Sequence, residues 1–188
     1  MDVLGSLFAA SIGGLVGGVY GAVAAKPAEK VAEDETVLRQ ALNKLGMQET
    51  MRNHVLEEAR SKTNYSFVVL LDEGPTSRGE GNSYRALESK GIDSVLEISM
   101  MFLELNGKEA VNPPLALSVT VEVRIIAVPH DFVVYHVPFS YKSQSRFYNE
   151  WAMNDAQPIR EELDRAYQNL AEQIVDELFL RNLRGQTP

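Results

Sequence analysis

The sequence contains no cysteine at any of its 188 positions. This absence excludes disulfide bonds, zinc sites built from thiolates and catalysis by a cysteine nucleophile. It also removes, within this sequence, the residue that would accept a bacterial lipid anchor. Cysteine-free chains suit both oxidising and reducing compartments, so the absence alone assigns no location.

Basic residues are also scarce, because 18 lysines and arginines stand against 26 acidic residues and leave a net charge of −8. No stretch of the chain gathers a basic stripe, so nucleic acid is not an expected partner. Histidine occurs only at positions 54, 130 and 136, without the spacing that places two metal ligands on one helix. We interpret all three as surface histidines and expect neither a metal nor a cofactor.

Catalytic motifs are missing as well. The chain has neither a Gly-x-Ser-x-Gly elbow nor a phosphate loop ending in Gly-Lys-Ser/Thr. The carboxylate pairs Glu161–Glu162 and Asp176–Glu177 are adjacent in sequence, and neighbours on a helix diverge by about 100°, so they indicate a solvated face. No catalytic residue can be named, and the sequence favours a protein that is not an enzyme.

What the chain does have is an uncharged glycine-rich start at residues 4–25. Gly13, Gly17 and Gly21 are spaced by four, and Gly14 and Gly18 begin a second row beside them. On a helix such rows form a surface without side chains, which another helix can approach closely. A helix of this length reaches about 33 Å, enough to cross a bilayer core of about 30 Å. The pattern predicts a glycine-zipper helix that associates with a membrane and with itself.

Two other interpretations of this start stay open. A secretory signal peptide is disfavoured because only Met1 and Asp2 precede the apolar run, where a basic region would be expected. The second alternative is a helix or hairpin that packs on the chain's own domain. We divide the chain into this segment (1–25), a linker and helix start (26–35), a domain (36–181) and a tail (182–188).

The periodicity of the domain predicts an α/β (α+β) fold. Met47, Met51, Val55 and Ala59 form one helical ridge, and apolar residues from Ile159 to Leu178 form another. A continuous apolar run at 67–71 predicts a buried strand, followed by a short helix at 84–90 that ends at Gly91. Alternating stretches then predict three further strands. Their expected inward side chains are Leu96, Ile98, Met100 and Phe102; Leu117 to Ile125 at every second position; and Val133 to Tyr141 likewise.

Together these elements predict a two-layer mixed sheet of about four strands covered by helices. One βαβ crossover would begin it and an antiparallel meander would complete it. Asn106–Gly107 is typical of a turn, and Pro138 indicates that the last strand lies at a sheet edge.

Two groups of residues are candidates for binding. Phe147, Tyr148 and Trp151 lie between the last strand and the last helix, where they could cap the core or form an aromatic contact for a partner protein. The loop after the first strand carries Asp72, Glu73 and Arg78, at a place where parallel sheets often bind ligands.

Residues 84–98, with their helix, Gly-x-Asp step (Gly91 to Asp93) and strand, resemble a segment of small bacterial envelope lipoproteins. The stretch 147–180 is similar to the carboxy-terminal part of uncharacterised members of that group. The resemblance covers about residues 36–181. It implies a fold like the periplasmic domain of the curli secretion-channel lipoprotein or the amino-terminal domain of the Tol-system propeller protein, and it carries over no catalytic residue. The chain departs from the group in lacking the lipid-anchor cysteine. Either the true start lies upstream, or the glycine-rich helix replaces the lipid.

These observations favour a non-enzymatic accessory protein of the bacterial cell envelope. Its domain would be periplasmic, held at the membrane by residues 4–25 and engaged with protein partners in assembly or transport. The alternative is a soluble ligand-binding or enzymatic domain with its site at the loop after the first strand.

Overall fold

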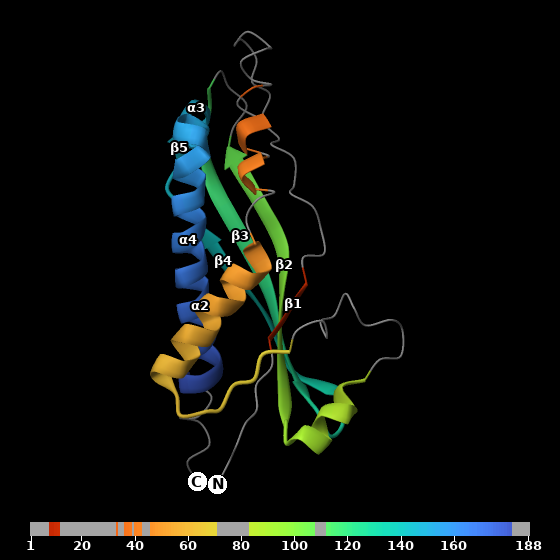
Figure 1. Ribbon diagram of the computed structural model, residues 1–188. Helices are drawn as coiled ribbons and strands as arrows, with labels where there is room; N and C mark the ends of the chain where they lie inside the picture. The colour runs from red at the N-terminus through yellow and green to blue at the C-terminus, as the bar shows by residue number, and fades with distance from the viewer. Residues whose placement is uncertain are drawn as a thin grey trace.

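A computed structural model of the chain describes residues 8–11, 33, 36–38, 40–42, 46–70, 83–107 and 112–181. Residues 33, 36–38 and 40–42 are helical. The other elements, shown in Figure 1, are β1 (Phe8–Ser11), α2 (Met47–Lys62), the 3₁₀ helix η1 (Tyr84–Lys90), β2 (Ser94–Gly107), β3 (Pro114–Ala127), β4 (Phe132–Lys142), β5 (Arg146–Phe147), α3 (Tyr148–Trp151), α4 (Met153–Val175) and the π-helical turn η2 (Asp176–Arg181).

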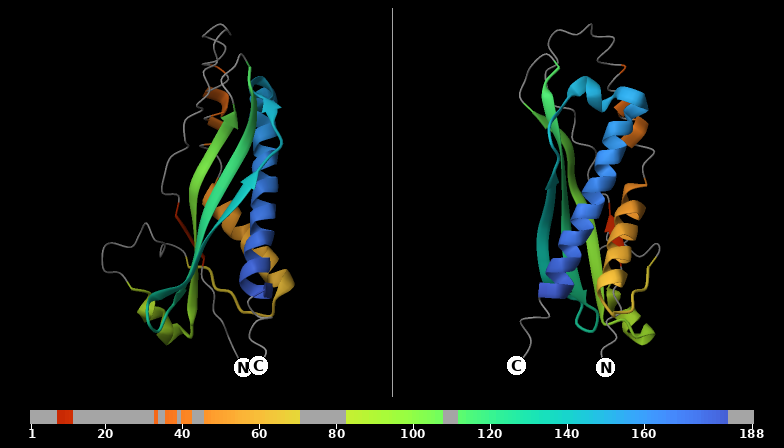
Figure 2. Two further views of the ribbon diagram at one scale, coloured as in Figure 1. Left: turned by 180° about the vertical axis from the view of Figure 1, so that it is seen from behind. Right: turned by 90° about the vertical axis from the view of Figure 1, so that its left-hand side faces the viewer.

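The strands form one mixed sheet in the order β1-β2-β3-β4, and the short β5 pairs with β3 beyond the end of β4. β2, β3 and β4 are antiparallel neighbours, whereas β1 runs parallel to β2. Helices α2 and α4 lie together against one face of this sheet, as the two views of Figure 2 show. The predicted two-layer fold class and the antiparallel meander are confirmed. β4 lies at an edge of the sheet, as Pro138 predicted.

The parallel strand is not the one that the sequence predicted. Of residues 67–70, only Phe67 takes part in a bridge, and the other three are not in a strand. β1 instead comes from the segment predicted to be a helix, with Phe8 opposite Leu96 and Ser11 opposite Ser99. Pairing with β1 satisfies backbone groups along the edge of β2 that would otherwise lack partners. The helix prediction is therefore wrong for Phe8–Ser11.

The rest of the glycine-rich segment, with Gly13, Gly14, Gly17, Gly18 and Gly21, lies outside the described residues, so its helical rows stay a prediction. Within the described part of the chain, no helix is both long enough and apolar enough to cross a bilayer.

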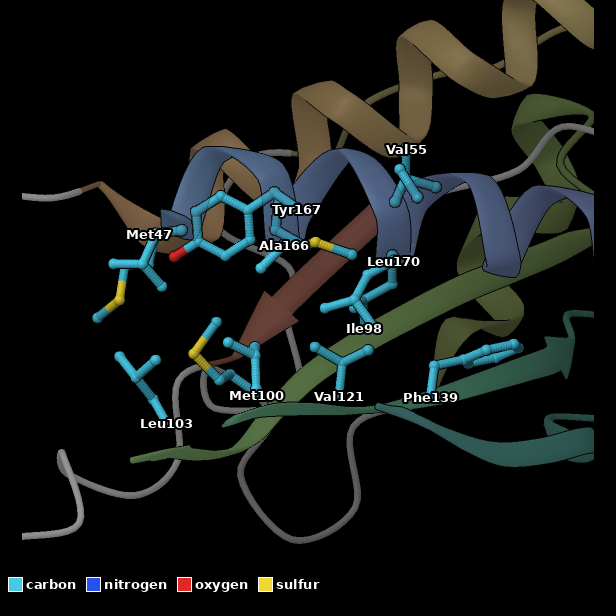
Figure 3. Packing of buried hydrophobic residues seen from close by; sticks show 14 of the residues in the cluster. Met47, Val55, Ile98, Met100, Leu103, Val121, Phe139, Ala166, Tyr167 and Leu170 are labelled. Carbon is cyan, nitrogen blue, oxygen red and sulfur yellow. The ribbon is translucent and has the colours of Figure 1, made fainter. Parts of the chain in front are cut away.

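The main core fills the space between the helices and the sheet. The predicted ridge of α2 (Met47, Met51, Val55 and Ala59) and the predicted stripe of α4 are buried. Figure 3 shows Val55, Tyr167 and Leu170 above the strands, with Ile98 and Val121 pointing up toward them. Sequence periodicity located this core because the apolar residues of α2, of α4 and of most of β3 recur on the face that turns toward it.

A β-bulge in β2 changes which side chains face that core. The register passes from Met100 opposite Val121 to Phe102 opposite Thr120, so Met101 is an extra, unpaired residue. One extra residue reverses the alternation of a strand. Met100 is buried as predicted, but Phe102 points to the opposite face and is 60% exposed, which overturns the prediction that it lies inside.

A second bulge lies near the start of β4, where Tyr135 pairs with Ile125 but Val133 pairs with Ile126. Val134 is the extra residue here, and the predicted inward orientation of Val133 is wrong, because Val133 is exposed. Asn106 and Gly107 also differ from prediction, since both lie in β2, opposite Ala116 and Leu115.

A smaller core covers part of the opposite face of the sheet. Leu87 and Tyr84 of η1 pack with Ile92, Val95 and Ile126 at one end of the sheet, far from α2 and α4 in the lower part of Figure 1. Gly91 ends η1 in the left-handed conformation, at φ 74°, as the predicted stop required.

The last helix begins with a left-handed turn. Asn154, Asp155 and Ala156 have φ values of 51°, 55° and 60°, a conformation that costs about 1–2 kcal/mol for each residue with a side chain. Regular right-handed geometry follows this turn, close to the predicted start at Pro158. Ala156 is fully buried at the turn, so packing holds the strained backbone in place.

Candidate functional site: the helix-free face of the sheet

Among the described residues, α2 and α4 cover one face of the sheet, and the opposite face carries only η1 at one end. We call this opposite face the open face. Its residues alternate with the core residues of the three long strands: Met101, Phe102, Glu104 and Asn106 of β2; Ser118, Thr120, Glu122 and Arg124 of β3; and His136, Pro138, Ser140 and Lys142 of β4. All of them are exposed or half-buried.

At one end of the open face, η1 covers a buried carboxylate. Glu97 is only 1% exposed, and the Tyr84 hydroxyl donates a hydrogen bond of 2.6 Å to its Oε1. The guanidinium of Arg124 lies 3.7 Å from Glu97 Oε2 and balances the charge. The backbone N–H of Tyr84 donates to Asp131, which ties the start of η1 to the β3–β4 turn. A buried charge is tolerated only when it is paired and hydrogen-bonded, so this cluster fixes η1 on the sheet.

Beside this cluster, polar pairs cross the strands. His136 Nε2 lies 2.6 Å from Glu122 Oε1, and the hydroxyls of Thr120 and Ser140 are 3.0 Å apart. These pairs satisfy one another across neighbouring strands, as cross-strand partners do. They make the middle of the open face polar, ordered and accessible.

On β2, at the level of Thr120 and Ser140, the open face is different because apolar side chains are exposed there. Phe102 is 60% exposed and Met101 is 41% exposed, and both owe their position to the bulge. Exposed aromatic and methionine side chains surrounded by polar groups are typical of protein-contact surfaces. This arrangement therefore supports a surface that binds another protein.

The histidines lie apart from one another. His54 Nε2 on α2 is 3.1 Å from Asp164 of α4, and the ring of His130 stacks on Phe132 at 5.8 Å. His130 and His136 are exposed, as expected, whereas His54 is partly covered. No group of three or more potential metal ligands occurs in the described ranges.

The structure separates the three predicted aromatic contact residues. Tyr148 and Trp151 are 1% and 0% exposed, and the indole N–H of Trp151 donates to the Leu115 carbonyl at 3.1 Å. Arg146 lies over the Trp151 ring at 5.5 Å. These two rings cap the core, which was one of the two interpretations of this group. Only Phe147, half exposed, is accessible to a partner, and its role in contact stays a prediction.

The predicted ligand loop cannot be placed, because Asp72, Glu73 and Arg78 lie outside the described residues. Sequence reasoning missed the exposure of Phe102 and the burial of Glu97. For Phe102 a signal existed: Met100 to Leu103 are four consecutive apolar residues in a stretch that was predicted to alternate. Such a run is compatible with a bulge.

No family model matches the sequence, and no curated protein matches it. Solved structures do resemble the fold. A protein of the DUF330 family from Xanthomonas campestris matches with 13% identity over 74% of this chain and 66% of its own, at a TM-score of 0.46. The match therefore leaves part of that protein without a counterpart here.

Two further structures illustrate the range of similar proteins. A hypothetical protein from Chlamydia trachomatis is 11% identical over 93% of this chain and 97% of its own, with a TM-score of 0.47. A lipoprotein from Neisseria meningitidis is 10% identical over 56% of this chain and 78% of its own, with a TM-score of 0.37. A lipoprotein is thus among the similar proteins, whereas the likeness to the curli and Tol domains stays a prediction.

Proposed function

We propose that this chain is a non-enzymatic accessory protein of the bacterial cell envelope that works through protein–protein contacts on its open face. One observation carries the contact part of the proposal: the ring of Phe102, 60% exposed, in the middle of a largely polar sheet face. A phenylalanine ring in water is costly, at roughly 25 cal/mol for each Å² of apolar surface. A partner that covers the ring recovers that free energy.

The surroundings of Phe102 support the same proposal. Thr120 and Ser140 already satisfy each other beside the ring, so covering them costs little hydrogen-bonding free energy. The residues stand on three long paired strands, which fix their spacing without a partner. Preorganised surfaces bind more tightly because less conformational entropy is lost on association.

The envelope part of the proposal is supported by residues 4–25, which carry no charge and hold two glycine rows. Strand β1 uses four residues of this segment, and those residues cannot form a strand on β2 and a membrane helix at once. We therefore propose fusing residues 4–25 to a soluble reporter and extracting the membranes with alkaline carbonate. Membrane anchoring requires the fusion to resist extraction, and a freely soluble fusion would rule it out.

Contact by the open face is tested with a photoreactive amino acid placed at Phe102 in the full chain, in its native host. A matched variant carries the same group at Glu57, an exposed position on α2. We expect crosslinked products for position 102 that are absent for position 57. Equal patterns for the two positions, or no product for position 102, would refute a contact function for this face.

A further inference from the structure

Two opposite charges on the open face have no ion-pair partner among the residues that the structure describes. Glu104 on β2 and Lys142 on β4 are both paired with Ser118 of β3, so they stand at the same level on either side of it. In the described part of the molecule, neither takes part in an ion pair, although Glu104 accepts a hydrogen bond of 2.6 Å from the Asn106 amide. Lys142 is exposed. One side of the face is thus acidic and the other basic.

This arrangement is complementary to itself under two-fold symmetry. Consider a second copy stacked on the open face, with the two-fold axis between the sheets and parallel to β3. The operation places β2 of one copy over β4 of the other and preserves the level along the strands. Glu104 of each copy then faces Lys142 of its partner copy, which gives two equivalent ion pairs.

The same operation covers the exposed ring. Phe102, Thr120 and Ser140 share one level across the three strands, next to the level of Glu104. In the stacked pair, Phe102 of each copy lies over Ser140 of the other, and the flanking ion pairs stand beside this contact. Stacked sheets lie about 10 Å apart, a spacing that a phenylalanine side chain can fill.

The other end of the sheet limits the contact. η1 covers the level of Glu97, so the copies can meet only from about the level of Ser99 to that of Asn106. Three strands about 4.8 Å apart and some six residues long give a footprint of roughly 300 Å² for each copy. Stable interfaces bury about 800 Å² on each side. The association is therefore weak and depends on protein concentration.

We propose that the open face binds a second copy of this chain, with Glu104 and Lys142 setting the two-fold register around Phe102. The inference rests on the proposed contact function and adds the identity of the partner, a second copy of this chain on the open face. It is separate from the predicted association through the glycine rows, which uses a different segment.

Charge reversal tests the register. In the full chain, Glu104→Lys and Lys142→Glu each create like-charge contacts, so each variant alone should dimerise at least tenfold more weakly than the wild type by sedimentation velocity. Mixing the two variants restores both ion pairs, and so does the double variant. The mixture and the double variant should therefore regain wild-type association, whereas Glu57→Lys on α2 should have no effect. Circular dichroism checks that each variant is folded.

Each other outcome counts against the inference. A monomeric wild type at all accessible concentrations, or single variants that associate as the wild type does, overturns the second-copy assignment. Association that Gly17→Leu abolishes and charge reversal leaves unchanged assigns the contact to the glycine rows instead. If the photoreactive group at Phe102 still captures a different protein, the proposed contact function stands and only its occupant is wrong.

Discussion

Replacing Trp151 by phenylalanine should destabilise the domain by about 2–4 kcal/mol. The indole N–H donates to the Leu115 carbonyl at 3.1 Å, and the residue is fully buried. Losing that donor leaves a buried carbonyl without this partner, at a cost of about 1–3 kcal/mol. The smaller ring leaves a cavity of roughly 40 Å³, which adds about 1 kcal/mol. The stacked Arg146 guanidinium loses its larger aromatic partner as well.

The assay is urea unfolding followed by far-ultraviolet circular dichroism. Tryptophan fluorescence is unsuitable because Trp151 is the sole tryptophan of the chain. Phe147→Ala provides the contrast, since its half-exposed ring should contribute less than about 1 kcal/mol. If Trp151→Phe unfolds at the wild-type urea concentration, or Phe147→Ala is the more damaging change, our division of this aromatic group into core and surface is wrong.

Two further predictions concern a close backbone contact and the alkaline limit of stability. Gly107→Ala should cost about 1–3 kcal/mol in urea unfolding, because an added Cβ would lie 2.5 Å from the Pro114 carbonyl oxygen; unchanged stability would mean that this contact relaxes freely. Burial, and secondarily the hydrogen bond to Glu162, raises the pKa of the Tyr141 phenol to about 12. Folding favours the neutral phenol, and its contribution to the free energy of unfolding is fully present below the unfolded-state pKa of about 10. This contribution is lost as the pH rises through the folded-state pKa of about 12. The urea midpoint should therefore fall across this window, less steeply for Tyr141→Phe, and equal slopes for the variant and the wild type would contradict the assignment.

The sequence predicted the elements whose apolar period is regular. The apolar residues of α2, α4 and the central part of β3 recur on one face, so periodicity alone placed Val55, Leu163 and Val121 in the core. It failed where an extra residue changes the phase of a strand. Met101 and Val134 each lie within a run of apolar residues, so the apolar pattern indicates an interrupted alternation without identifying the extra residue.

The candidate site was harder to predict than the core for a related reason. Glu97 lies at a position that alternation assigns to solvent, and its burial depends on η1, the segment just before β2, folding back over the sheet. Phe102 has an apolar side chain, which is typical of a core residue, but this side chain is exposed on the surface. The pairing of β2 with β3 fixes the orientation of Phe102, and the packing of η1 buries Glu97. Both are tertiary contacts, which an alternating pattern does not contain.

The meander has a consequence for the order in which the molecule assembles. β2, β3 and β4 follow one another within residues 94–142, so their ladders close short loops. Phe8 must reach Leu96 across 88 positions of chain before β1 can pair. Loop-closure entropy rises with that separation, so we expect the three-stranded meander to form early and β1 to join late. During synthesis the amino-terminal strand emerges first and must wait for the edge that receives it. Until β2 has paired with β3, residues 8–11 lack the strand edge that receives them and remain accessible to other contacts.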